Sequence, residues 1–124
     1  MACMSDHHCD AIVVVCIDFR FQKYIRNWTD THLENKTFDL VGYAGSTKNL
    51  DTIIEQIGIS VGLHSIKEVY LIHHEECGAY GSESTFERHS QDLKKAKEMI
   101  LAENPALRIY LYYLHLNGQF DKVV

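Results

Sequence analysis

The fold is decided by one stretch near the N-terminus, AIVVVCI at residues 11–17. The stretch is apolar without alternation and rich in β-branched side chains, as a strand buried on both faces of a parallel sheet requires. A strand with one face in water would instead alternate apolar and polar residues. We therefore expect residues 11–17 to form a central strand.

Helical and extended patterns alternate after this stretch. Apolar side chains recur every three or four residues, as on one face of a helix, within residues 21–33, 50–61 and 86–101. The runs predicted to be strands are residues 37–41, 66–73 and 107–116. Gly58 and Gly62 are expected to mark a tightly packed or frayed end of the second helix, and Pro105 should end the third.

A hairpin is expected near the C-terminus. Asn117-Gly118 is a two-residue turn signal, because both central residues of a type I′ turn need positive φ. Residues 120–124 should then fold back as an edge strand. Together these patterns predict an α/β domain of three layers, with a four-stranded parallel sheet in the order 2-1-3-4, an antiparallel fifth edge strand and helices on both faces. We assign residues 11–124 to this single domain and residues 1–10 to a flexible N-terminal tail.

Composition and charge argue against two classes of partner. The 124 residues carry a formal net charge of −5, with acidic and basic side chains interspersed, so neither a nucleic acid nor an anionic membrane is expected to bind. No apolar stretch approaches the roughly 20 residues that span a bilayer, and the first ten residues do not resemble a secretory signal. We expect a cytoplasmic protein whose four cysteines are reduced thiols.

Reactive side chains follow the predicted strands at the point where each ends. Cys16, Asp18 and Arg20 come after the first strand, and His74 and Cys77 come after the third. Ligands of open α/β sheets bind at the carboxyl ends of the strands, so we expect these groups to share one edge.

Two thiolates and a neutral imidazole are a favoured ligand set for zinc. Cys16, His74 and Cys77 supply three such ligands and leave a fourth position, as in catalytic rather than structural zinc sites. Asp18 can accept a hydrogen bond from a water molecule there, and Arg20 can keep that carboxylate ionised. The structural alternatives are a buried thiol at Cys16 and a helix cap formed by Asp18 and Arg20.

Two short motifs resemble the paired signature of the β-class carbonic anhydrases: CIDFR at residues 16–20 and HEECG at residues 74–78. The resemblance implies zinc ligands at Cys16, His74 and Cys77 and a catalytic dyad of Asp18 and Arg20. It leaves open whether Asp18 is itself the fourth ligand.

The resemblance also implies a function and an assembly. A zinc-bound hydroxide would reversibly hydrate carbon dioxide to bicarbonate, with the substrate near the backbone of Ala44 and Gly45. The chain would form a homodimer or a higher homo-oligomer in which a neighbouring copy completes the pocket.

The sequence departs from the family pattern in three ways. It lacks peripheral helices common in the family, it has Gly42-Tyr43 where an Arg-Asn pair is common, and it has residues 7–10 where plant-type members carry a substrate-contacting glutamine. Two alternatives therefore stay open. One is hydrolysis of carbonyl sulfide or carbon disulfide at the same site, and the other is a noncatalytic zinc-stabilised binding or regulatory module.

Several further residues have a structural interpretation beside a functional one. His73 should point away from His74 and be packed or hydrogen bonded. Glu75 and Glu76 are expected to be solvated turn residues, although either could orient His74, and Tyr80 could line the pocket or pack. The predicted tail holds four metal-capable side chains, for which we expect only adventitious affinity because a mobile segment must order itself on binding: Cys3, His7, His8 and Cys9.

Overall fold

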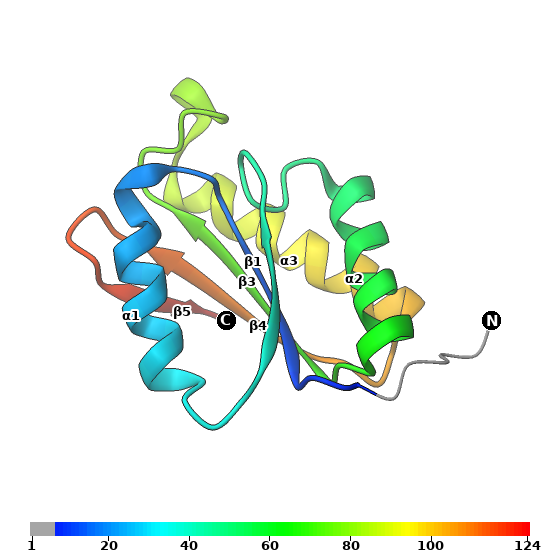
Figure 1. Ribbon diagram of the computed structural model, residues 1–124. Coiled ribbons are helices and arrows are strands. Elements are labelled where there is room, and N and C mark those ends of the chain that lie inside the picture. The colour runs from blue at the N-terminus through cyan, green and yellow to red at the C-terminus, as the bar shows by residue number, and fades with distance from the viewer. Residues whose placement is uncertain (1–6) are drawn as a thin grey trace.

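The computed structural model describes residues 7–124, and within them the chain forms one five-stranded sheet in the order β2-β1-β3-β4-β5 (Figure 1). The first four strands are parallel, and the fifth pairs antiparallel with β4. The predicted fold class and strand order are thus confirmed. The strands are β1 (Ala11–Val15), β2 (Phe38–Gly42), β3 (Glu68–His74), β4 (Arg108–Leu114) and β5 (Phe120–Val123).

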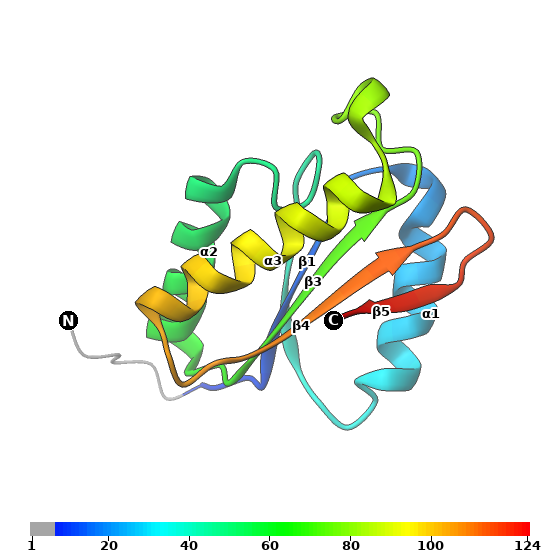
Figure 2. The ribbon, with the colours of Figure 1, turned by 180° about the vertical axis from the view of Figure 1, so that it is seen from behind.

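Helices cover both faces of the sheet. Helix α1 lies on one face, while α2 and α3 lie on the other, as Figures 1 and 2 show from opposite sides. Two short 3-10 helices, η1 and η2, precede α1 and α3. The helical segments are η1 (Phe19–Phe21), α1 (Gln22–His32), α2 (Leu50–His64), η2 (Gly81–Glu83) and α3 (Phe86–Glu103).

Strand β1 is the centre of two separate cores. Ile12 and Val14 pack with residues of α2 and α3, whereas the alternate residues Ala11, Val13 and Val15 pack with residues of α1. All five residues of β1 are buried. The absence of alternation in the sequence is explained by this double burial.

Helix α2 continues through Gly58 and Gly62 and ends at His64. The expectation of a packed or frayed end at these glycines is wrong. Both lie on the exposed face, where a Cβ would have no heavy atom of the described residues within 4 Å. The helix is held by the buried face of Ile53 and Ile57 and ends where Ser65 turns left-handed at φ 55°.

The hairpin between β4 and β5 has a three-residue loop, so the predicted two-residue type I′ turn is wrong. The His115 N–H donates to the Gln119 carbonyl at 2.8 Å, and the Gly118 N–H donates to the His115 carbonyl at 2.9 Å. Of Asn117 and Gly118, only the glycine has positive φ. This is the pattern of a type I turn followed by a left-handed glycine.

The start of the domain is tied to the sheet one or two residues before β1. The Cys9 N–H donates to the His64 carbonyl at 3.0 Å, and the Asp10 N–H donates to the Thr37 carbonyl at 3.0 Å. The assignment of residues 1–10 to a flexible tail stays a prediction, and Cys3 lies outside the described residues. Among the residues described, we find no helix with the length and apolar character to cross a membrane.

Replacing Gly118 with alanine should destabilise the domain. The residue has φ of +93°, and a Cβ there would lie 2.6 Å from Tyr24 Cε1. We expect G118A to lower the free energy of unfolding by about 1–3 kcal/mol, measured by urea denaturation. The matched control is G62A on the exposed face of α2, which should raise it by about 0.5–1 kcal/mol. Equal stability of the two variants would contradict this structure of the hairpin.

Candidate metal centre

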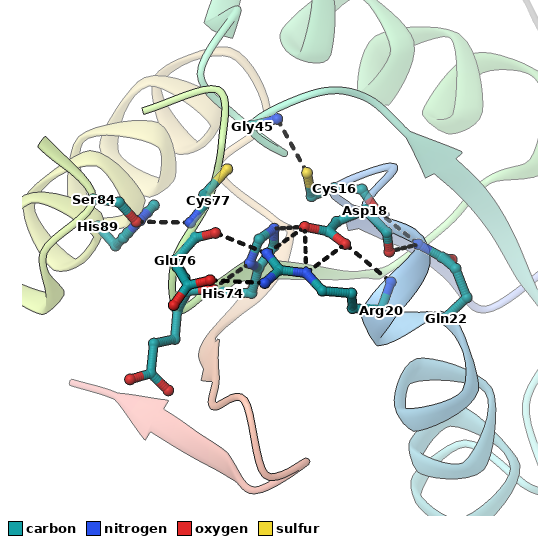
Figure 3. A network of polar contacts seen from close by, with 11 residues as sticks. Cys16, Asp18, Arg20, Gln22, Gly45, His74, Glu76, Cys77, Ser84 and His89 are labelled. Atoms are coloured by element: carbon teal, nitrogen blue, oxygen red, sulfur yellow. Dashed lines mark hydrogen bonds and ion pairs between the residues drawn. The ribbon is translucent and has the colours of Figure 1, made fainter. Parts of the chain in front are cut away.

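Three side chains from two distant segments of the sequence converge at the carboxyl ends of β1 and β3. Cys16 directly follows β1, His74 is the last residue of β3, and Cys77 lies in the turn after it. All three are buried, and one ligand atom from each lies within 4.8 Å of the others. The expected convergence at one edge of the sheet is therefore observed (Figure 3).

The imidazole of His74 is oriented for binding a cation. Its Nδ1 lies 2.7 Å from the Glu75 carbonyl oxygen, which can only accept a hydrogen bond, so Nδ1 carries the ring proton. The other nitrogen, Nε2, is then a bare acceptor, and it is buried without a hydrogen-bond partner among the described residues. A histidine that donates from one nitrogen to a carbonyl and leaves the other free is the arrangement of a metal ligand. Of the two glutamates considered for orienting His74, Glu75 does so, through its backbone.

The two thiols interact with each other and with the loop after β2. A hydrogen bond with Cys77 lowers the pKa of Cys16, while the same bond raises the pKa of Cys77. The Gly45 N–H also donates to Cys16 Sγ at 3.3 Å. The pair thus readily holds one negative charge, and a divalent cation would favour the loss of the second proton.

Arg20 holds both carboxylate oxygens of Asp18. Arg20 Nε lies 3.1 Å from Oδ1, and a terminal nitrogen of the guanidinium lies 2.7 Å from Oδ2. These hydrogen bonds lower the pKa of Asp18, so its side chain is an anion near neutral pH. Asp18 Oδ2 lies 3.9 Å from His74 Nε2, which puts the carboxylate beside the three converging side chains.

Glu76 extends this network. Arg20 donates to the Glu76 carboxylate and to its carbonyl oxygen, both at 2.9 Å. Glu76 also has φ of +58°, a left-handed conformation that turns the chain between His74 and Cys77. Glu76 is thus the exposed turn residue expected from sequence, and it is also a partner of Arg20. The guanidinium links the loop after β1 to the turn after β3 (Figure 3).

Three further contributors were not predicted from the sequence. Gln22 Nε2 donates to the carbonyls of Cys16 and Asp18, at 3.1 and 2.8 Å. The Cys77 N–H donates to Ser84 Oγ at 2.9 Å, and Ser84 is hydrogen bonded to His89 Nε2 at 2.9 Å. The four-residue spacing of Asp18 and Gln22, at the start of a helix, could have indicated the contact between the Gln22 side chain and the Asp18 carbonyl. No sequence pattern pairs Ser84 and His89 with Cys77.

His73 and Tyr80 are packed around the centre. His73 Nε2 lies 2.7 Å from Thr47 Oγ1, and its Nδ1 lies 2.8 Å from Nδ1 of His89. The expectation that His73 is packed and hydrogen bonded is confirmed, and burial lowers its pKa to about 3, so it is neutral. Tyr80 packs with Cys16 and Cys77 and donates its hydroxyl hydrogen to Asp92 at 2.6 Å.

The loop after β2 approaches the centre through Ala44 and Gly45. Gly45 has φ of +82°, and a Cβ there would lie 2.8 Å from Lys48 Cβ, so this position requires glycine. Ala44 lines an open depression of about 390 Å³. The other lining residues are mostly apolar: Cys16, Ile17, Asp18, Phe19, Gly78 and Ala79.

Comparisons with known proteins bear on the family and the fold of the chain. A family model described as "Putative carbonic anhydrase" matches residues 6–124. An uncharacterized protein of Rickettsia bellii (strain RML369-C) is 28% identical over 132 aligned residues, covering 90% of this chain and 80% of the relative.

Solved structures share the fold at low sequence identity. The β-carbonic anhydrase isoform I of Trichomonas vaginalis superposes with a TM-score of 0.65 at 14% identity, covering 100% of this chain and 87% of that one. An apo carbon disulfide hydrolase superposes with a TM-score of 0.67 at 12% identity, covering 94% of this chain and 80% of that one. A tetrameric β-carbonic anhydrase of Sordaria macrospora superposes with a TM-score of 0.58 at 13% identity, covering 94% of this chain and 81% of that one.

Replacing Cys77 with serine should remove one equivalent of zinc per chain. A serine hydroxyl is a poor zinc ligand compared with a thiolate, so the remaining Cys16 and His74 would bind weakly. We expect elemental analysis of the gel-filtered protein to show the loss, whereas the same substitution at Cys3 should retain the wild-type zinc content. Full zinc content in C77S would contradict the assignment of this centre.

Proposed function

The chain belongs to the carbonic anhydrase family whose model it matches, and on this premise we propose that it catalyses the zinc-dependent reversible hydration of carbon dioxide to bicarbonate. The observation that carries the proposal is the buried Nε2 of His74, which has no hydrogen-bond partner within residues 7–124 and lies beside two thiols and an anionic Asp18. A structural metal site would be expected to have a fourth cysteine or histidine, whereas here an Arg20-bound carboxylate lies next to the ligands.

Cys16, His74 and Cys77 would hold the ion. The two thiolates balance its charge, and the neutral imidazole completes a donor set that zinc favours. Zinc, when bound, supplies Lewis acidity that brings the pKa of a water molecule down toward about 7. The hydrogen bonds to Cys16 from Gly45 and to the Glu75 carbonyl from His74 keep these donors in place before the ion arrives.

Asp18 would orient the nucleophilic water by accepting its hydrogen bond. Both carboxylate oxygens already accept from Arg20, which keeps Asp18 ionised and limits its rotation. This double hold favours Asp18 as the orienting residue over Asp18 as the fourth ligand. Arg20 in turn is anchored by Glu76, so the orienting pair is tied to the turn that carries Cys77.

The apolar depression beside the centre would admit the substrate. Carbon dioxide is small and carries no net charge, so a surface formed by Ile17, Ala44 and Ala79 can bind it without a charged partner. The backbone at Ala44 and Gly45 adjoins Cys16, in keeping with the substrate-binding role proposed for that loop.

Replacing Asp18 with asparagine should reduce carbon dioxide hydration by about 10–100-fold while zinc is retained. The amide cannot provide two acceptor oxygens, so the link between Arg20 and the water molecule is lost. Stopped-flow hydration assays on zinc-quantified protein measure the effect. The control is Asp30→Asn, an exposed aspartate on α1, which should keep wild-type turnover. Unchanged turnover in D18N would remove the dyad from the mechanism.

Hydrolysis of carbonyl sulfide or carbon disulfide is a second candidate for the same centre. It is favoured by the apolar lining of the depression and by the fold shared with a carbon disulfide hydrolase. Measuring sulfide release beside hydration separates the two. Zinc binding with neither activity would instead support a noncatalytic zinc-stabilised module.

We propose that a second copy of the chain covers the depression. Its rim carries two apolar side chains in water, Phe19 at 85% exposure and Ile17 at 62%. Apolar side chains gathered at the rim of a site are typical of an interface. A homodimer or larger homo-oligomer would bury them and exclude bulk water from the centre.

Charging this rim should separate the copies. We expect Phe19→Glu to raise the dissociation constant of the oligomer at least about tenfold, because the buried carboxylate would lack a partner. Sedimentation velocity gives the measurement. Leu116→Glu changes another exposed apolar residue, in the β4–β5 loop, and should leave the assembly intact. A monomeric wild-type chain would contradict the proposal.

We also propose that the protein acts in the cytoplasm. Cys9, Cys16 and Cys77 form no disulfide with one another in the part of the chain that the structure describes, and a reducing compartment maintains that state. The proposed zinc site needs Cys16 and Cys77 reduced.

A further inference from the structure

A second set of metal-ligating side chains lies at the opposite end of the sheet. Cys9 precedes β1, Asp39 is the second residue of β2, and His64 is the last residue of α2. One ligand atom from each lies within 4.8 Å of the others. Cys16 follows β1 and His74 ends β3, whereas Cys9 and Asp39 lie near the amino ends of β1 and β2.

We propose that Cys9, Asp39 and His64 bind a second divalent transition-metal ion of the zinc class. Thiolate sulfur, carboxylate oxygen and imidazole nitrogen are all established zinc donors. In tetrahedral coordination, neighbouring donor atoms lie roughly 3.3–3.8 Å apart, given metal–ligand bonds of about 2.0–2.3 Å. Atoms already within 4.8 Å of one another reach that spacing through small side-chain rotations.

The backbone places these donors without help from an ion. The Cys9 N–H donates to the His64 carbonyl at 3.0 Å, which fixes the cysteine beside the end of α2. Asp10 is tied to the sheet by its N–H and by its carbonyl, which accepts from the Lys67 and Glu68 N–H groups. These backbone hydrogen bonds hold Cys9 beside α2, so little further ordering of this residue would be needed to bind an ion.

Asp39 is the residue on which the cluster converges. His64 Nδ1 lies 2.7 Å from Asp39 Oδ2, and Ser60 Oγ donates to the same oxygen at 2.6 Å. The pKa of the Cys9 thiol is raised, mainly by burial and also by the negative charge of the Asp39 carboxylate. The Cys9 thiol now donates to the Ala11 carbonyl at 3.5 Å. A cation would replace that thiol proton and the proton between His64 Nδ1 and Asp39, while the Ser60 hydroxyl would go on orienting the carboxylate.

A further imidazole adjoins the cluster. The ring of His7 lies with its centroid 4.8 Å from that of His64. A fourth protein donor is what distinguishes a closed structural zinc site from an open catalytic one. The ion would then tie the start of the chain to both β2 and α2.

Zinc stoichiometry tests this proposal on the full chain. We expect two equivalents of zinc per wild-type chain after gel filtration and one equivalent in Cys9→Ser. Asp39→Asn should also lose one equivalent, and it serves as a second variant if Cys9→Ser fails to fold. The matched control is His8→Ala, an exposed neighbour that should retain both equivalents. One equivalent in both wild type and C9S would overturn the proposal. An equal loss in H8A would also overturn it, since it would indicate adventitious binding by the terminal segment.

Cobalt absorption provides a readout specific to Cys9. In a Cys16→Ser/Cys77→Ser background, added cobalt(II) should give a thiolate-to-metal charge-transfer band that disappears when Cys9 is also replaced. An absent or Cys9-independent band would contradict the second site. This result is separable from the proposed function, because loss of zinc in C77S with retention in C9S would support only the first centre, and the reverse only the second.

Discussion

The parallel alignment of β1 and β3 is the constraint on which the rest of the structure depends. Because the two strands run side by side in the same direction, Cys16 after one and His74 at the end of the other reach the same edge. The alignment is maintained by burial, since β1 packs into a core on each face. The energy that forms the metal centre is therefore the hydrophobic energy of the sheet, and the donors are brought together before any ion binds.

Much of the fold could be predicted because its determinants are local in the sequence. The unbroken apolar run of β1 indicates a central buried strand, and its alternation with three helical stripes indicates a parallel sheet between layers of helices. The errors fall at glycines. Helix α2 continues through Gly62 because its buried face holds it as far as the turn at Ser65. Gly118 ends a three-residue hairpin loop in which Asn117 does not take positive φ. Loop geometry depends on neighbours such as Tyr24, which a local pattern does not include.

The convergence of the metal-binding side chains was predictable because it follows from local patterns in the sequence. The hydrogen bonds that hold these side chains in place were not predictable. Cys16, His74 and Asp18 are positioned by strand ends, which the sequence indicates. The links from Arg20 to Glu76 and from Cys77 to Ser84 join segments 56 and 7 residues apart in the chain, and nothing in either segment identifies its partner. The cluster of Cys9 with Asp39 and His64 was likewise invisible, because it depends on the packing of α2 against the start of the sheet.

The measurement that tests the central claim most directly is carbon dioxide hydration by zinc-quantified wild-type protein from about pH 6 to about pH 9. If Cys16, His74 and Cys77 hold zinc beside the carboxylate of Asp18, turnover should rise with pH around the pKa of about 7 that zinc gives a water molecule. Stoichiometric zinc with no hydration at any pH in that range would contradict the account.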